Sequence, residues 1–205
     1  NRENPEFDLV VPVNWRAAQM IAADWVEPIP LEIVPNHVNL DPAYMSNSWD
    51  RGSRYQMPWQ TGITGIAYNP ALTGRPLSSI DDLFDPRFKG LAMLANGDDP
   101  SRPTVPGAEA GLNRVREAIQ SGQVKVVSDD FDDKLASGEL IATMAWSGDT
   151  AVLQGERPDI EFVIPDEGAI QWFDAMVIPK RAANIAAAGR FMNYVYDPAN
   201  AARIT

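Results

Sequence analysis

The sequence predicts an α/β protein with a largely parallel sheet. Short apolar runs alternate along the chain with segments of helical periodicity, which is the pattern of strand and helix units. Some of these runs are apolar throughout, as in strands that are covered on both faces. The 205 residues, of which 45% are hydrophobic, can form the core of one large or two small domains.

The first half of the chain is expected to begin with one strand and one helix. FDLVVP (7–12) is an apolar run closed by proline, and Asn14 is placed to cap a helix that extends to Trp25. Residues 28–58 are rich in proline and asparagine, which predicts a loop-dominated stretch. The glycines and β-branched residues of TGITGIAYN (61–69) predict a strand.

The second half alternates helices and strands more regularly, without an internal repeat. Ser78 or Ser79 caps a short helix, and residues 91–96 suit either a helix or a strand. One strand ends at Trp146. That strand lies within 139–148, and the other strands are expected within 124–127, 159–165 and 169–179. The remaining helices are expected within 110–122, 129–137, 149–156 and 184–198.

Charge and composition exclude several classes of function. The net charge of -11 argues against nucleic acid as a partner, because phosphate binding needs clustered Lys and Arg. It favours cationic ligands only weakly, since many soluble proteins are acidic. The absence of cysteine excludes disulfides and thiolate chemistry. The single histidine, His37, excludes a multi-histidine metal site within this chain, so no metal or cofactor is expected.

The N-terminal sequence NRENPEFD has neither the basic start nor the apolar stretch of a signal peptide. We expect either a cytosolic protein or a protein whose leader is absent from this sequence. The strand expected from residue 7 favours the second possibility, because the chain enters its fold almost at once.

Tryptophans at the ends of expected strands mark a candidate binding site. Trp172 and Asp174 are two positions apart in AIQWFDAMVIP (169–179) and share one face of an extended chain. Trp146 ends a strand and Trp15 follows one, and open α/β sheets bind ligands at strand ends. Three rings around one carboxylate suit an organic ammonium, through cation–π contacts and a charge-assisted hydrogen bond.

Simpler structural explanations exist for the same residues. Trp172 and Asp174 also fit a core tryptophan beside a carboxylate that caps a helix or pairs with an arginine. Trp59 fits a tryptophan packed in a turn. Gln60 and Thr61, just before an expected strand, would line a binding cleft with neutral hydrogen-bonding groups.

The order of several motifs resembles a known family. Each motif alone is weak, but their ordered combination is specific and covers nearly the whole chain. The chain resembles the spermidine/putrescine-binding component of a bacterial ABC importer. The motifs are FDLVVP followed by Asn14 and Trp15, NLDP, MPWQTGITGIAYN, LFDPRFKG, MAWSGD, VIPDEGAIQWFDAMVIP and FMNYVYDPANAARI.

The resemblance implies a two-lobed periplasmic-binding-protein fold of type II, in which each lobe is a mainly parallel sheet flanked by helices. The polyamine would be clamped in the cleft between the lobes. One lobe would hold residues 1–66 and 173–205, and the other residues 67–172.

The resemblance also implies roles for the candidate residues. Trp15 and Trp146 correspond to aromatic walls, and Trp172 with Asp174 to the pair that stacks on the ligand and anchors its amine. The full predicted set of ligand-binding residues is Asn14, Trp15, Gln60, Thr61, Trp146, Trp172 and Asp174.

Three segments that the family has are not found in this sequence. Relatives begin with a further strand and helix, have a longer acidic passage between Lys89 and Leu91, and end with positions that close over the ligand. We expect either ordered parts of a longer protein or a true truncation. A truncation would leave Asp174 without acidic companions, weaken binding, and expose a sheet edge near Val10 and Val11.

Together these features predict a non-catalytic receptor that captures putrescine or spermidine and delivers it to a membrane ABC permease through hinge closure. We expect a monomer in the periplasm or at the extracellular face of the membrane, and a lipid anchor would lie outside this sequence. Two alternatives stay open. One is a receptor for another cationic or amino-acid-like solute, including choline-like heads. The other is a hydrolase that pairs Asp174 with Asp149.

Overall fold

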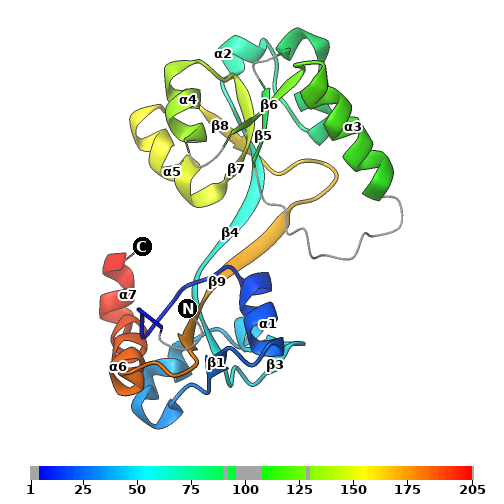
Figure 1. Ribbon diagram of the computed structural model, residues 1–205. Helices are drawn as coiled ribbons and strands as arrows, with labels where there is room; N and C mark the ends of the chain where they lie inside the picture. The colour runs from blue at the N-terminus through cyan, green and yellow to red at the C-terminus, as the bar shows by residue number, and fades with distance from the viewer. Residues whose placement is uncertain (1–4, 90–91, 96–107, 128–129, 205) are drawn as a thin grey trace. The chain divides into compact units, whose positions relative to one another are not determined.

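The chain folds as two compact units. In the computed structural model the first unit comprises residues 1–61 and 172–205, and the second unit residues 62–171. Two strands, β4 (Gln56–Tyr68) and β9 (Ile170–Pro179), run through both units (Figure 1). The assignment of functional lobes to residues 1–66 with 173–205 and to 67–172 stays a prediction. The structure describes residues 5–89, 92–95, 108–127 and 130–204.

In the first unit, β9 is the central strand. β1 (Val26–Glu27) pairs antiparallel with β9, and β4 neighbours β9 on its other side in the sheet order. Alternate side chains of β9 face different clusters, as expected for a strand. Phe173 and Ala175 pack with α1 (Asn14–Ala22), whereas Met176 packs with α6 (Ile185–Val195). The core of this unit therefore lies on both faces of one strand.

The run FDLVVP is not a continuous strand. Val10 forms an isolated antiparallel bridge to Val177, and Phe7 and Val11 are 63% and 43% exposed. The expectation of a parallel strand covered on both faces is therefore wrong here. The reason is that β9 occupies the covered position, and residues 7–13 lie along its edge.

Helix α1 begins one residue earlier than the sequence predicts. Its N-cap is Val13, whose backbone is extended and still forms a bridge to Asp174. The prediction that Asn14 is the N-cap is wrong. Asn14 is instead the first helical residue, and its side-chain oxygen accepts a hydrogen bond from the backbone N–H of Trp15 at 3.0 Å.

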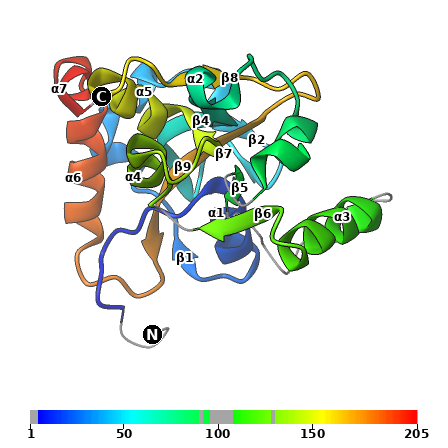
Figure 2. The same cartoon turned by 90° about the horizontal axis from the view of Figure 1, so that it is seen from above.

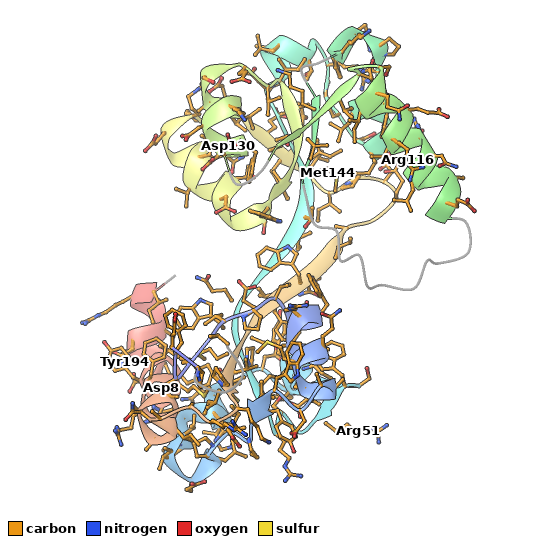
Figure 3. The ribbon with its side chains drawn as sticks, viewed as in Figure 1. Asp8, Arg51, Arg116, Asp130, Met144 and Tyr194 are labelled. Atoms are coloured by element: carbon orange, nitrogen blue, oxygen red, sulfur yellow. The ribbon has the colours of Figure 1, made fainter. Side chains whose placement is uncertain are left out.

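Hydrogen bonds at both ends of α6 help to hold it against the rest of the first unit. The backbone and side-chain amides of Asn184 each donate to the carboxylate of Asp8 at 2.8 Å, which holds the N-terminal segment beside the start of α6 (Figure 3). The buried Tyr196 hydroxyl donates to the carbonyl of Pro58 at 2.5 Å, and its burial raises the pKa of the phenol. α7 (Pro198–Ile204) follows α6 directly in both views (Figures 1 and 2).

Residues 28–58 consist mainly of short turns, as predicted, although β4 begins at Gln56 rather than at residue 61. The buried carboxylate of Asp50 accepts hydrogen bonds from the backbone N–H groups of Arg54, Tyr55 and Gln56 at 2.9–3.0 Å, which fixes the turn that leads into β4. The elements of this stretch are η1 (Leu31–Ile33), η2 (Pro35–Asn39), η3 (Pro42–Met45), β2 (Ser46–Asn47) and β3 (Asp50–Arg51).

The sheet of the second unit is mixed. β6 (Val124–Val127), β5 (Ala92–Ala95) and β7 (Ala142–Trp146) pair in parallel, as expected for a largely parallel sheet. Residues 92–95, for which the sequence left helix and strand open, form a strand. β7 and β8 (Glu161–Val163) both pair antiparallel with β4, so the sheet is not parallel throughout. The helical elements are α2 (Pro70–Thr73), η4 (Ile80–Phe84), η5 (Pro86–Phe88), α3 (Ala108–Gln120), α4 (Phe131–Ser137) and α5 (Ser147–Glu156).

Gly65 allows β8 to pair closely with β4. A Cβ atom at this position would lie 2.6 Å from the backbone carbonyl oxygen of Val163 and 2.5 Å from the ring of Phe162. The carbonyl belongs to the paired strand and cannot rotate away. The close packing of β4 and β8 therefore requires the second glycine of TGITGIAYN, Gly65.

Substituting Gly65 by alanine should destabilise the second unit. We expect Gly65→Ala to lower the free energy of unfolding by about 1–3 kcal/mol because of the steric overlap. Gly155→Ala is the matched control, since that glycine lies in α5 with open space around its Cβ position. The control should be neutral or stabilising by up to about 1 kcal/mol. Urea denaturation measures both, and equal effects of the two substitutions would contradict this account.

Candidate functional site

Asp174 is the carboxylate on which the candidate site depends. Its side chain is half-buried on β9, and burial raises the pKa of its carboxyl above the ordinary value of 3.8. No arginine, lysine or backbone amide of the described residues pairs with the carboxylate. The simpler explanation, a carboxylate that caps a helix or pairs with an arginine, therefore has no support in that part of the chain. A partly desolvated charge without a counter-charge is suited to receive a cation.

Trp172 lies on the same face of β9 as Asp174, by the alternation of strand side chains. Its indole Nε1 is buried and has no acceptor among the residues that the structure describes. Its backbone carbonyl accepts a hydrogen bond of 2.8 Å from the hydroxyl of Thr61. Thr61 is thus tied to β9 through its side chain. The sequence gives no local signal of this contact, because the two residues are 111 positions apart.

Asn14 and Trp15 are the first two residues of α1, which starts beside the same stretch of β9. The bridge between Val13 and Asp174 places the start of α1 beside that strand, and the Ala175 backbone N–H donates to the carbonyl of Pro12 at 2.8 Å. Both candidate side chains are half-buried. The structure therefore brings five predicted residues of the first unit to one region of the backbone, namely Asn14, Trp15, Thr61, Trp172 and Asp174.

Trp59 and Gln60 line a hollow that none of the residues around Asp174 lines. Trp59 stacks on Phe191 of α6, with ring centroids 6.0 Å apart and planes inclined by 22°, and is a half-buried residue packed against the core. The hollow has a volume of about 360 Å³, and Tyr196 and Ile204 line it as well. None of the other predicted site residues lines that hollow.

Trp146 belongs to the second unit. It ends β7 and directly precedes α5, as the sequence predicts. Its ring packs edge-on against the ring of Phe131, with ring centroids 5.6 Å apart, so part of the indole is used for packing. Asp149 lies in the first turn of α5 and therefore in a different unit from Asp174. The wall function of Trp146 stays a prediction.

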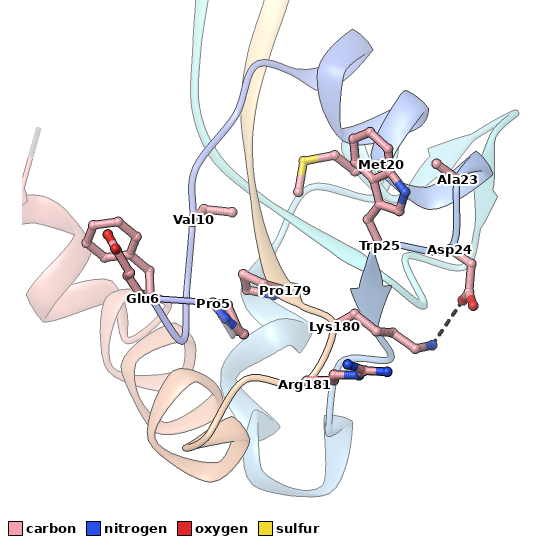
Figure 4. A pocket seen from close by; sticks show the side chains of 11 residues that line it. Pro5, Glu6, Val10, Met20, Ala23, Asp24, Trp25, Pro179, Lys180 and Arg181 are labelled. Atoms are coloured by element: carbon pink, nitrogen blue, oxygen red, sulfur yellow. Dashed lines mark hydrogen bonds and ion pairs between the residues drawn. The ribbon is translucent and has the colours of Figure 1, made fainter. Parts of the chain in front are cut away.

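A larger hollow of about 900 Å³ lies elsewhere in the first unit (Figure 4). Its apolar lining includes Met20 and Trp25, and its charged groups include Lys180, which forms an ion pair with Asp24 at 2.9 Å. None of the predicted ligand-binding residues lines it. Because acidic and basic groups are mixed there, this hollow does not match the predicted site of three tryptophan rings around one carboxylate.

Within 5–89, 92–95, 108–127 and 130–204, no group of three or more histidine, aspartate or glutamate side chains is arranged to hold a metal ion. No helix in these ranges has the length and hydropathy needed to span a bilayer.

The chain matches known proteins along its whole length. The family model described as bacterial extracellular solute-binding protein matches residues 1–205. Spermidine/putrescine-binding periplasmic protein 1 of Haemophilus influenzae is 26% identical over 220 residues, which cover 99% of this chain and 60% of that protein. The corresponding Escherichia coli protein is 26% identical over 211 residues, covering 94% and 59%. The chain thus spans about 60% of the length of these relatives.

Solved structures show the same fold. A putative spermidine/putrescine ABC transporter protein from Listeria monocytogenes has a TM-score of 0.83 and 29% identity, covering 96% of this chain and 65% of that one. The TpPotD lipoprotein of Treponema pallidum has a TM-score of 0.81 and 22% identity, covering 98% and 68%. These matches confirm the predicted periplasmic-binding-protein fold and the resemblance to polyamine-binding proteins.

The ligand-free protein should become more stable when Asp174 is neutralised. The folded-state pKa of this carboxyl lies above its unfolded value, so folding favours the protonated form and stability is lost as pH rises through these values. At pH 7, Asp174→Asn should raise Tm by about 1–3 °C, and the gain should shrink as the pH approaches 3.8. Glu32→Gln, at an exposed position of the same unit, should leave Tm unchanged. A lower Tm for Asp174→Asn at pH 7 would show that the carboxylate has a stabilising partner.

Proposed function

The chain belongs to the family of bacterial extracellular solute-binding proteins, and from that premise we propose that it binds a linear polyamine, putrescine or spermidine. One observation carries the proposal: Asp174 is a half-buried carboxylate without a counter-charge in the described structure, and it shares a strand face with Trp172. The Haemophilus and Escherichia relatives, which are named for these ligands, support the choice of a polyamine.

An ammonium group beside Asp174 would supply the counter-charge that the carboxylate lacks. A charge-assisted hydrogen bond contributes about 1.5–3 kcal/mol, and each indole that faces an alkylammonium adds about 0.5–2 kcal/mol. Trp172 and Trp15 would provide rings from the first unit, and Trp146 a ring from the second. The methylene chain of the polyamine would stack on these apolar faces. At the upper ends of these ranges the contacts together reach the free energy of micromolar affinity, about 8 kcal/mol.

The same proposal includes the biological role. The protein would act without catalysis, as a monomer, in the periplasm or at the outer face of the membrane, and would deliver its ligand to an ABC permease. The periplasmic relatives and the solute-binding family support this role.

A second candidate ligand is an amino-acid-like solute that carries a cation and a hydrogen-bond acceptor. The observation that favours it is the buried indole Nε1 of Trp172, which has no acceptor in the described chain. An indole N–H is a donor only, and a fully protonated polyamine offers no acceptor. Thermal-shift measurements with spermidine, lysine and choline at equal concentration separate these ligands, because the ligand of higher affinity raises Tm more.

Neutralising Asp174 should weaken polyamine binding strongly. Loss of one charge-assisted hydrogen bond predicts an affinity for putrescine and spermidine that is about 10- to 150-fold lower in Asp174→Asn than in the wild type. Isothermal titration calorimetry measures the change. Glu32→Gln removes the same charge from an exposed site of the first unit and should bind as the wild type does. Equal affinities of Asp174→Asn and the wild type would refute the anchoring role.

A further inference from the structure

The loop between β8 and β9 is fastened to a distant turn by two carboxylates. The Ser78 hydroxyl donates to the Asp166 carboxylate at 3.1 Å, and the Asp166 backbone N–H donates to the Ser78 carbonyl at 2.7 Å. The Ser79 hydroxyl donates to the Glu167 carboxylate, which also accepts the Ile80 backbone N–H at 3.2 Å. We call these five residues the carboxylate clamp. All of them belong to the second unit.

The turn that receives the clamp is itself braced. Ser79 is the N-cap of η4, and its oxygen accepts the Asp81 backbone N–H at 3.0 Å. The Asp82 carboxylate accepts the backbone N–H groups of Ser78 and Ser79 at 2.8 and 3.0 Å and pairs with Arg75 at 2.6 Å. Asp166 and Glu167 therefore bind to a part of the unit whose own hydrogen bonds hold it in place.

Apolar packing holds the loop only at Pro165, which is buried. Ile164 and Ile170, at its two ends, are 53% and 66% exposed, and the residues between 166 and 169 are exposed as well. Gly168 turns the chain with a φ of 97°, a conformation that other residues rarely adopt. Beyond Pro165, the hydrogen bonds of the carboxylate clamp are the described contacts that hold Asp166 and Glu167 in place.

The charge of Glu167 suits its part in the clamp. Hydrogen bonds from the Ser79 hydroxyl, from its own backbone N–H and from the Ile80 N–H lower the pKa of the carboxyl, against the opposing effects of desolvation and of the Asp82 charge. The carboxylate is therefore ionised at neutral pH. Hydrogen bonds to a charged acceptor are stronger than those between neutral groups.

We propose that Asp166 and Glu167 are positioning residues for the ligand-binding strand, because they fix the point at which the chain enters β9 just before Trp172 and Asp174. This inference rests on the proposed function for its consequence in ligand binding. The alternative is a purely structural role, in which Glu167 only caps η4. A cap would affect the stability of the second unit without changing the start of β9.

The test uses Ser79→Ala, Glu167→Gln and the double variant, with Glu156→Gln as a matched control at an exposed site of the same unit. Two ligand-free measurements decide the proposal. They are hydrogen exchange of the Asp166 and Gly168 amides, which donate to Ser78 and Pro165, and the NMR signal of the Trp172 indole. Each single variant should speed exchange about 5- to 50-fold and shift or broaden the indole signal, and the double variant should add little to either.

Three further outcomes separate the possibilities. Ser79→Thr keeps the hydroxyl and should restore slow exchange and the original indole signal. Spermidine affinity should fall about 3- to 10-fold in the single variants and stay unchanged in Glu156→Gln. An unchanged indole signal in both single variants would overturn the proposal, even if the second unit lost stability. A wild type that does not bind spermidine would contradict the proposed function alone, since exchange and the indole signal are measured without ligand.

Discussion

An uncompensated carboxylate on a core strand is the constraint on which this structure depends. β9 supplies buried side chains to both clusters of the first unit, yet it also carries Asp174, whose burial raises its pKa without a counter-charge among the residues described. Such a charge lowers the stability of the folded protein. Its presence is explained if a cation binds there, because the ligand then supplies the interaction that the fold does not.

The contacts around β9 hold the strand in place before any ligand arrives. The backbone of residues 10–13 bridges its outer edge, the Thr61 hydroxyl donates to the Trp172 carbonyl, and the carboxylate clamp fixes the loop before it. The first two contacts constrain backbone atoms near Trp172 and Asp174, and the clamp constrains Asp166 and Glu167. A strand held in this way loses little conformational freedom on binding, which favours affinity.

Sequence reasoning succeeded where local signals are strong. The strand that ends at Trp146 and the cap at Ser78 or Ser79 both follow from short patterns, and the structure confirms both, with Ser79 as the cap. It failed for FDLVVP, because an apolar run does not reveal whether it is central or lies along another strand. It also could not find the contact of Thr61 with β9 or that of Ser79 with Glu167, since these partners are distant in sequence and leave no periodic pattern. The wall role of Trp146 and the part of Gln60 in binding stay predictions.

The most direct test of the central claim is the pKa of the Asp174 carboxyl, measured by carbon-detected NMR titration with and without putrescine. We predict a pKa above 3.8 in the ligand-free protein and a marked decrease when putrescine binds, because the ammonium stabilises the carboxylate. A ligand-free pKa at or below 3.8 that putrescine does not change would contradict the account.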